Sequence, residues 1–199
     1  MRKIITVNWL NKINACSDAV EAFKNQKETN PIKVVQGAMK IDKFDWANWL
    51  IVRLMNRKQK IQYAIFAAES VIDIYEKKHP DDKRPRNAIE AAKKVLKRDT
   101  KKNRAAAAYD AEAAFGAYSV AVWADFYAVA VAATYTAWVA STFPADNITS
   151  SDVAVWAAYA ATYADGNTNR KKQLQNKIIN YGIKIIKRNE PDTKVASET

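Results

Sequence analysis

The stretch AAAAYDAEAAFGAYSVAVWADFYAVAVAATYTAWVA, residues 105–140, decides the fold class. It contains a single glycine and no proline, lysine or arginine, and alanine recurs throughout it. Because alanine is the strongest helix former, the stretch predicts long helices. The helical pattern extends from Arg104 to Thr142, and one rod of that length would measure about 58 Å at 1.5 Å per residue, too long for a compact domain. We therefore expect a break near Gly116.

The larger block 105–164 is expected to form the core of the protein. Of its 60 residues, 23 are alanine and 12 are aromatic, and such a mixture of small and large side chains suits tightly packed helices. The block has no basic residue, whereas residues 1–104 hold 24 basic and 12 acidic side chains and residues 165–199 hold 8 and 4. The formal net charge of +11 therefore describes a basic exterior around a cation-free centre. The acids of the block are Asp110, Glu112, Asp125, Asp146 and Asp152.

Length and composition point to one all-α domain. The chain has 199 residues, of which 49% are hydrophobic, and this is enough for one well-buried core. Four glycines and five prolines supply too few turns for a fold of many short strands. We expect a compact multi-helix bundle of about seven to nine helices, with an Ala/aromatic-rich central core, a single domain over residues 1–199, and a frayed tail from about residue 189.

Apolar spacing and helix breakers place the other helices. In the segment 58–77, the residues Ile61, Ile65, Ala68, Ile72 and Tyr75 fall on one face, which predicts an amphipathic helix that ends before Pro80. A last helix should place Leu174, Ile178, Tyr181 and Ile185 on one face, with a basic opposite face. The remaining expected helices cover residues 15–24, 31–41, 44–56, a segment from Pro85 or Asn87 to about Arg98, and a segment from residues 149–151 to 164.

Membrane insertion is the main alternative to a soluble bundle. Residues 126–143 are uncharged and long enough to be considered as a span, and basic residues flank the block. However, Ala, Thr and Tyr are poor substitutes for Leu and Ile in hydrocarbon, and Asp125 adjoins the stretch. The first ten residues also lack a sustained apolar region and a cleavage site. We expect no membrane insertion and a cytoplasmic location.

The composition argues against most catalytic sites. A single cysteine, Cys16, cannot form an intramolecular disulfide, and a single histidine, His79, leaves no pair for a zinc site. The glycine positions allow neither a dinucleotide fingerprint nor a phosphate-binding loop. We expect Cys16 to be a packing residue and His79 to be solvated in a turn. The chain is therefore predicted not to be an enzyme and to bind no metal or cofactor.

The segment DDKRPRNAIE, residues 81–90, carries the most specific chemistry. In a structural interpretation, bidentate pairs with nearby acids such as Asp82 and Glu90 hold Arg84 and Arg86 and fix the loop. In a functional interpretation, the two guanidinium groups and the helix N-terminus bind a phosphate or a carboxylate. The candidate binding residues are Asp82, Arg84, Arg86, Glu90 and Asp125.

Asp125 is a candidate because its sequence neighbours are apolar, so that burial would require a partner from another segment, such as Arg53, Arg84 or Arg86. The alternative is that Asp125 faces water. Catalysis at the arginine pair, with Asp125 or Glu90 as the base, is a third hypothesis.

The run Asp82-Lys-Arg-Pro-Arg-Asn-Ala-Ile-Glu90, together with Asp45-Trp-Ala-Asn-Trp-Leu50, Ala68-Glu69 and Ala15-Cys16 with Ala19, resembles a known family. It is similar to the immunity proteins of bacterial polymorphic-toxin systems, specifically the fifth numbered immunity family, whose members also occur in phage and prophage genomes. The resemblance covers roughly residues 15–140. It implies an all-helical, non-enzymatic protein that binds and neutralises a toxin or a defence component, with Asp82, Arg84, Pro85, Arg86 and Glu90 in the shared motif.

Nucleic acid is the alternative partner, because several groups of basic residues could form a phosphate-binding stripe. The competing interpretation is that these residues belong to solvated helix faces. Self-association is also left open. The candidate contacts are Lys93, Lys94, Lys97, Arg98, Lys101, Lys102, Arg104, Arg170, Lys171 and Lys172, with Arg57, Lys58, Lys60 and Lys177 as further members of the stripe.

Overall fold

The computed structural model describes residues 4–118, 124–141, 147–163 and 167–188. Within these residues the protein is all-α, as predicted, with eleven helices and no strand. The sequence led us to expect seven to nine helices, and the difference arises at two places. A short helix α1 (Val7–Lys12) precedes α2 (Ser17–Lys24), and the predicted helix 58–77 is divided into α5 (Arg57–Glu69) and α6 (Ile72–Lys78).

The division between α5 and α6 occurs at Ser70. Its hydroxyl donates a hydrogen bond to the Phe66 carbonyl at 2.8 Å, and Val71 leaves the helical conformation with φ −133°. A serine that bonds back to the preceding turn competes with the helical ladder, and the β-branched residues that follow do little to restore it. The predicted apolar face is nevertheless buried from Ile61 to Tyr75, so the interruption changes the path of the helix and not its orientation toward the core.

The remaining helices are close to the predicted ranges. Asparagines 30, 56 and 167 cap three of them with their side chains, the second in a capping box with Gln59. Gly116 lies inside α8, which ends at Tyr118, close to the position where the sequence predicted a break. The ranges are α3 (Pro31–Lys40), α4 (Phe44–Arg53), α7 (Arg84–Lys97), α8 (Lys101–Tyr118), α9 (Ala124–Ser141), α10 (Asn147–Ala161) and α11 (Thr168–Lys187).

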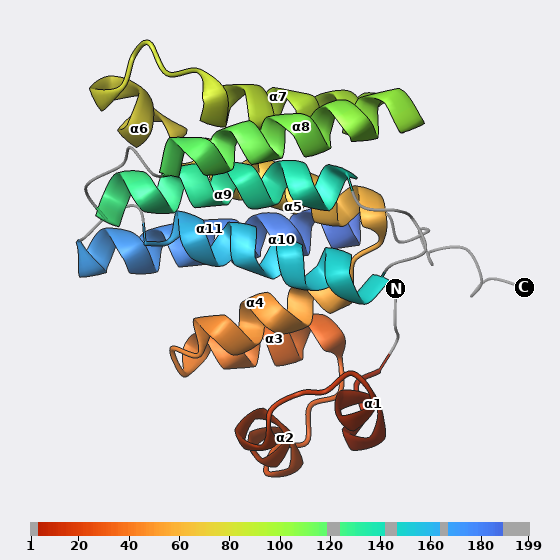
Figure 1. The fold of residues 1–199 in the computed structure, drawn as a ribbon. Coiled ribbons are helices and arrows are strands. Elements are labelled where there is room, and N and C mark those ends of the chain that lie inside the picture. Colours follow the sequence, from red (N-terminus) through yellow and green to blue (C-terminus); the bar gives the residue numbers. More distant parts are fainter. Residues whose placement is uncertain (1–3, 119–123, 142–146, 164–166, 189–199) are drawn as a thin grey trace, which may run out of the picture.

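Helix α9 is the centre of the bundle (Figure 1). It packs against α7 and α8 on one side, α5 and α6 behind, and α10 on the other side. Helix α11 covers α4 and α5, α3 pairs with α4, and the α1–α2 pair lies at the far end from α7 and α8. None of the described helices is long and apolar enough to cross a membrane.

The composition of the core differs from the expectation in one respect. Alanine fills the contacts among α8, α9 and α10, as predicted; Ala111, Ala132 and Ala157 are examples that are completely buried. None of the block's aromatic residues whose side chains are described is fully buried, although Tyr135, Trp138 and Tyr159 pack against the core. The aromatic part of the predicted core is therefore not borne out for these residues. Seven aromatic side chains are exposed or half-buried: Tyr109, Phe115, Tyr135, Trp138, Trp156, Tyr159 and Tyr163.

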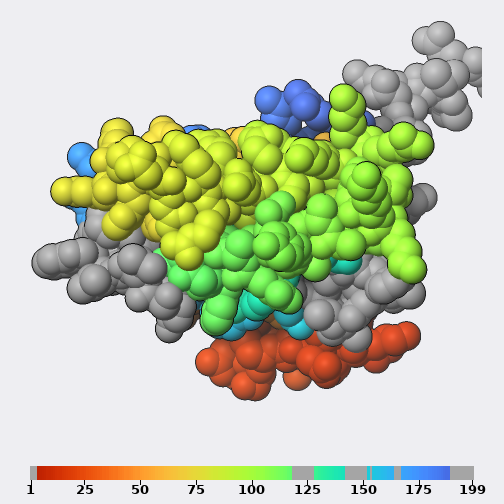
Figure 2. All heavy atoms as spheres, turned by 45° about the horizontal axis from the view of Figure 1, so that its top comes forward, coloured from red at the N-terminus to blue at the C-terminus, as the bar shows by residue number. Residues whose placement is uncertain are grey.

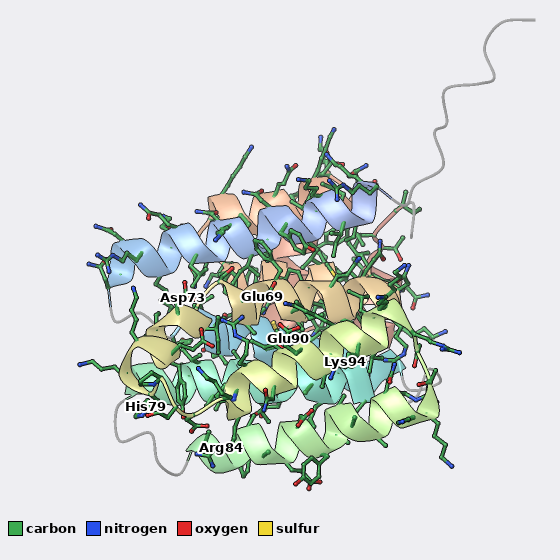
Figure 3. All side chains as sticks on the ribbon, turned by 90° about the horizontal axis from the view of Figure 1, so that it is seen from above. Glu69, Asp73, His79, Arg84, Glu90 and Lys94 are labelled. Carbon is green, nitrogen blue, oxygen red and sulfur yellow. The ribbon has the colours of Figure 1, made fainter. Side chains whose placement is uncertain are left out.

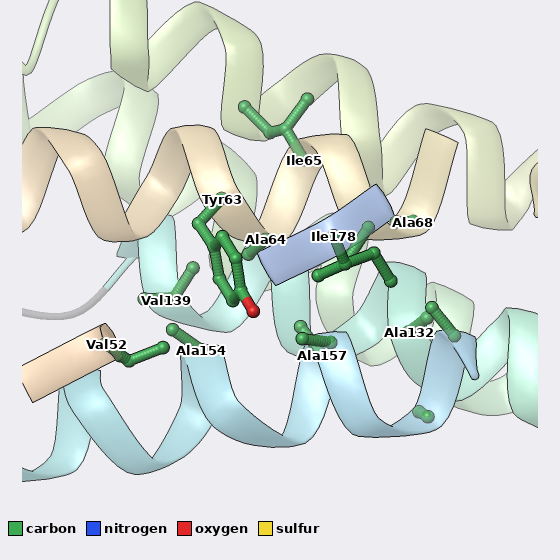
Figure 4. Packing of buried hydrophobic residues seen from close by; sticks show 14 of the residues in the cluster. Val52, Tyr63, Ala64, Ile65, Ala68, Ala132, Val139, Ala154, Ala157 and Ile178 are labelled. Carbon is green, nitrogen blue, oxygen red and sulfur yellow. The ribbon is translucent and has the colours of Figure 1, made fainter. Parts of the chain in front are cut away.

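Buried polar side chains connect the helices around α9. The Tyr63 ring extends from α5 toward α10 (Figure 4). Its hydroxyl donates a hydrogen bond to Asn48 Oδ1 on α4 at 2.9 Å, and Asn48 Nδ2 donates to the Val155 carbonyl on α10 at 3.0 Å. Burial raises the pKa of Tyr63 well above its usual value. The Thr136 hydroxyl on α9 lies 3.1 Å from the Ala64 carbonyl on α5. Because no buried polar atom among the described side chains lacks a hydrogen bond, these contacts specify one arrangement of the four helices.

Arg57 secures the end of α9. Its Nη1 and Nη2 donate to the carbonyls of Val139 and Ala140 at 3.0 and 2.8 Å, and its Nε lies 3.3 Å from Asp99 Oδ2 in the α7–α8 connection. A cation at a helix C-terminus binds carbonyls that have no partner within the helix, and it opposes the negative end of the macrodipole. One side chain therefore joins the start of α5, the end of α9 and the turn before α8.

Helix α11 approaches α4 and α5 closely through Gly182. A Cβ atom at this position would lie 2.8 Å from Ile51 Cδ1, 2.9 Å from Tyr63 Cε2 and 3.0 Å from Met55 Cε. The Tyr63 ring is completely buried and cannot move aside easily. Gly37 on α3 is the opposite case, because a Cβ atom there would meet nothing within 4 Å.

We predict that Gly182→Ala destabilises the protein by about 1–3 kcal/mol, because the added methyl group overpacks the contact of α11 with α4 and α5. Gly37→Ala is the matched control and should stabilise α3 by about 0.5–1 kcal/mol, because alanine is the better helix former and its methyl group has room. Urea unfolding followed by circular dichroism measures both changes. Equal effects of the two substitutions would contradict the packing described for α11.

Candidate functional site

The predicted motif 81–90 covers the end of the turn between α6 and α7 and the first half of α7. Arg84 Nε donates to Asp82 Oδ1 at 2.9 Å and Nη2 donates to Oδ2 at 2.7 Å, a bidentate pair. The Tyr75 hydroxyl donates to the same carboxylate at 2.7 Å, and the Arg84 amide donates to it at 3.1 Å. The Arg84 guanidinium also faces α8, since its Nη1 would lie 3.5 Å from a Cβ atom on Gly116. The first of the two expected pairs is therefore present.

The second pair differs from the expectation. Arg86 does not pair with Glu90 but with Glu76 on α6, through Nε to Oε1 at 2.8 Å and Nη2 to Oε2 at 2.6 Å. Glu90 instead binds Lys93, whose ammonium group also lies 2.7 Å from Glu69 Oε1 on α5. Figure 3 shows Glu69 and Glu90 side by side on neighbouring helices and Arg84 at the start of α7. These pairs join α5, α6 and α7 into one charged network.

The arginines of the motif are thus held by carboxylates of the same chain, as the structural interpretation requires. Arg53, the other expected partner of Asp125, pairs with Asp152 at 2.6 Å and lies over the Trp49 ring at 3.8 Å. The side chain of Asp125 lies outside the described residues. The pairs Asp82–Arg84 and Glu76–Arg86 set the angle between α6 and α7, and we call these four residues the clamp.

The clamp lowers the pKa of Asp82 far below its usual range, chiefly through the hydrogen bond from Arg84. Burial, together with the bond to Asp82, raises the pKa of Tyr75 to about 12. In the same way, Arg86 lowers the pKa of Glu76 by its hydrogen bonds. A carboxyl group whose folded pKa is depressed stabilises the fold above its unfolded pKa and loses this contribution as the pH falls.

We predict that Asp82→Asn lowers the unfolding free energy by about 1–2 kcal/mol at pH 7, because a charged hydrogen-bond acceptor is removed. The difference from the wild type should narrow as the pH is lowered below about 4, where the unfolded carboxyl group titrates. Asp81→Asn is the control, since Asp81 is exposed and forms no ion pair with a described residue. A destabilisation that did not change with pH would contradict the electrostatic origin of the clamp.

Cys16 is placed differently from the expectation, and His79 meets the expectation only in part. Cys16 is exposed at the N-cap of α2 and is not a buried packing residue. His79 is half-buried at the end of α6, with its ring centroid 4.8 Å from that of Tyr75. Among the residues that the structure describes, no three His, Cys, Asp or Glu side chains are grouped in a way that could hold a metal ion.

The candidate phosphate contacts separate into two groups. Lys93 and Arg104 are engaged with acids, the latter with Asp99 at 2.6 Å. Lys172 pairs with Asp42 at 2.6 Å, and Lys171 lies 3.5 Å from the centroid of the Tyr163 ring. The members that are exposed and form no ion pair with a described residue are Lys94, Lys97, Arg98, Lys101 and Lys102.

These five cations and three from the end of α11 make up the surface that we call the basic end: Lys94, Lys97, Arg98, Lys101, Lys102, Lys184, Lys187 and Arg188. The first turn of α5 joins its two parts, because Arg57 binds Asp99 and Gln59 Nε2 donates to the Ile185 carbonyl at 3.0 Å. Figure 1 shows the end of α7, the start of α8 and the end of α11 at the same side of the bundle. Lys101 and Lys102 lie in the first turn of α8, where the macrodipole is also positive, so their placement does not stabilise the helix.

A row of aromatic rings crosses α8, α9 and α10, and sequence reasoning missed it by assigning the rings to the core. Ring contacts run from Phe115 to Trp138 (centroids 6.2 Å apart), then to Tyr135 (5.4 Å), Trp156 (6.4 Å), Tyr159 (5.7 Å) and Tyr163 (4.8 Å). We call these six residues the aromatic row. Phe115, Trp156 and Tyr163 are 51%, 52% and 45% exposed.

The row occupies the open side of α9. Helices α5, α7, α8 and α10 cover the other sides, and the open side faces the viewer in Figure 1. In Figure 2, α9 and α10 reach the surface as a narrow band between α8 and the N-terminal helices. At one end of the row, the hydroxyl groups of Tyr159 and Tyr163 are 2.7 Å apart, and this bond raises the pKa of Tyr159 to about 12.

Helical spacing contained a signal for the row. Tyr135 and Trp138 are three residues apart, and Trp156, Tyr159 and Tyr163 follow the i, i+3, i+7 pattern of one helix face. The opposite faces hold alanine. Spacing therefore identified the face, whereas only the packing of α9 decides that this face is outside the core.

Comparison with known proteins adds no assignment: no protein-family model matches the chain, and no curated protein and no solved structure matches it significantly. The family resemblance rests on the residues quoted in the sequence analysis alone.

Proposed function

We propose that the chain is a non-enzymatic protein that neutralises a macromolecular partner, and that a folded protein docks on the aromatic row. The observation that carries this proposal is the run of six contacting rings at the surface of α8, α9 and α10. Soluble proteins rarely expose contiguous apolar surface without a binding role. Tryptophan and tyrosine are also the residues that contribute most to protein–protein affinity.

The immunity or anti-defence role implied by the family resemblance agrees with such a surface. A protein that blocks a toxin or a defence component needs a binding face and no catalytic group. In this proposal the motif 81–90 positions α6 and α7, and binding takes place on the neighbouring face. The clamp residues are then required for stability and not for contact with the partner.

We predict that Trp156→Ala and Tyr163→Ala each weaken capture of the partner about tenfold or more, because large rings at an interface centre dominate binding. Tyr109→Ala is the control; Tyr109 is 75% exposed on α8 and makes no contact with the row. Affinity capture from cells that naturally express the protein, quantified by mass spectrometry, compares the three variants with the wild type. Unfolding free energies measured in parallel exclude loss of fold as the cause.

The proposal fails if no protein is captured in proportion to the bait, or if the two row variants and Tyr109→Ala capture the same proteins equally. A protein whose capture depends on the aromatic row should also become cross-linked to a photoreactive amino acid placed at residue 156. It should not become cross-linked to one placed at residue 109.

Nucleic acid is the second candidate partner, and the basic end is the observation that favours it. Eight cations gather there without an ion pair to a described residue, and α11 contains no acidic residue. A phosphate backbone is the partner that such a surface fits best, because each neutralised phosphate releases counterions.

If the basic end binds nucleic acid, log affinity should fall with log salt by about 0.9 per phosphate contacted. The double charge reversal Lys97→Glu with Lys101→Glu should reduce this slope by the equivalent of two or more phosphate contacts. The control is Lys12→Glu with Lys24→Glu, which changes the net charge by the same amount on the N-terminal helices. Fluorescence anisotropy with a labelled 20-nucleotide duplex and a single strand of the same sequence measures the slopes. Equal effects of the two double variants would assign the binding to net charge alone.

A further inference from the structure

An apolar cleft of about 610 Å³ lies between the α1–α2 pair and the α3–α4 pair. Leu10 and Leu50 are buried at its base, and Phe23 lines the side formed by α2. Volumes of about 300–1,000 Å³ are typical of sites that bind small molecules. The other apolar side chains that line the cleft are Ala15, Ala19, Ala22, Val34, Ala38, Ile41, Trp46 and Trp49.

Two segments that stood out in the sequence meet in this cleft. Residues 15–19 precede and begin α2, and residues 45–50 form the first half of α4. Neither the clamp nor the aromatic row uses them. They line opposite sides of the cleft, with the two indole rings of Trp46 and Trp49 on the α4 side.

Gly37 keeps the α3 side of the cleft open. It lines the cleft, and a Cβ atom on it would meet nothing within 4 Å. Glycine lowers the stability of a helix interior by about 0.5–1 kcal/mol relative to alanine, so its presence in the middle of α3 has no advantage for the helix itself. It does leave room for a ligand against the backbone.

The charges at the mouth indicate the head group of a ligand. Three charged residues line the cleft, and two of them, Glu28 and Lys33, pair with each other at 3.3 Å. The third, Asp45, forms no ion pair with a described residue. The uncompensated charge among the lining residues is therefore negative. The two indole rings already have cations of the chain beside them, Lys43 at 5.0 Å from the Trp46 centroid and Arg53 at 3.8 Å from the Trp49 centroid, so Asp45 is the group that decides the charge of the ligand.

We propose that the cleft binds a small, mainly apolar molecule with an uncharged or cationic head group. The apolar part lies among the alanine, leucine and tryptophan side chains, and the head group lies at the mouth near Asp45. An anionic amphiphile such as a fatty acid would bring a second carboxylate to Asp45 and is disfavoured. The site goes beyond the proposed function, because no residue of the aromatic row or the basic end lines the cleft.

The test uses the full chain and the neutral fluorescent probe N-phenyl-1-naphthylamine, which is then displaced by 1-octanol, octylamine or octanoate. Gly37→Phe fills the cleft, and Gln36→Phe is its control, because Gln36 is an exposed neighbour on α3 that does not line the cleft. Ala19→Phe fills the cleft from the other side. Circular dichroism verifies the fold of each variant, so that a failure of one blocking variant to fold leaves the other as the test.

We expect saturable probe binding to the wild type, a loss of about tenfold or more in either folded blocking variant, and little change in Gln36→Phe. Octylamine and 1-octanol should displace the probe at lower concentrations than octanoate, and Asp45→Asn should remove this difference between amine and carboxylate. Absence of saturable binding to the wild type, or equal binding by Gly37→Phe and Gln36→Phe, overturns the site. A preference for octanoate overturns the assigned head group. Capture of a protein by the aromatic row is a separate measurement and does not depend on these results.

Discussion

Alanine at the contacts of α9 with its neighbours is the constraint on which the rest of the structure depends. A helix that presents only methyl groups lets the next helix approach closely, and close packing then excludes larger side chains from the contact. Ala132, Ala133 and Ala137 on α9 and Ala157 and Ala158 on α10 are completely buried in this way. The described aromatic side chains of the same helices lie toward the outer faces, and none of them is fully buried. One constraint thus produces both the tight core and the row of exposed rings.

The second organising feature is the division of the cations by their partners. Arg57, Arg84, Arg86 and Lys93 each bind carboxylates or helix-terminal carbonyls, and each joins at least two segments of the bundle. The cations of the basic end make no such contacts with described residues. The positive charge that gives the net value of +11 is therefore not distributed uniformly over the surface. Some arginines and lysines hold the fold, and the eight cations of the basic end concentrate a positive potential at one side of it.

Local sequence patterns were sufficient to predict most of the helices and the Asp82–Arg84 pair of the clamp. The face from Ile61 to Tyr75 and the pairing of Arg84 with Asp82 both depend on residues close in sequence, and both were predicted. The pairing of Arg86 with Glu76 was not, because it depends on how α6 folds back on α7, and Glu90 has an equally suitable spacing. Whether a face such as Tyr135–Trp138 belongs to the core is likewise decided by the neighbouring helices.

The aromatic row and the basic end differ in what they contribute to binding. The rings are held by one another and by the bond between Tyr159 and Tyr163, so ordering them against a partner removes little conformational entropy. The long side chains of the basic end form no ion pair with a described residue, and each loses rotamer freedom when it is fixed. Rigid rings therefore suit affinity, whereas mobile charges suit long-range attraction and the rate of encounter. On the proposed function, a protein partner with acidic residues at the edge of its interface would be attracted by the basic end and held by the aromatic row.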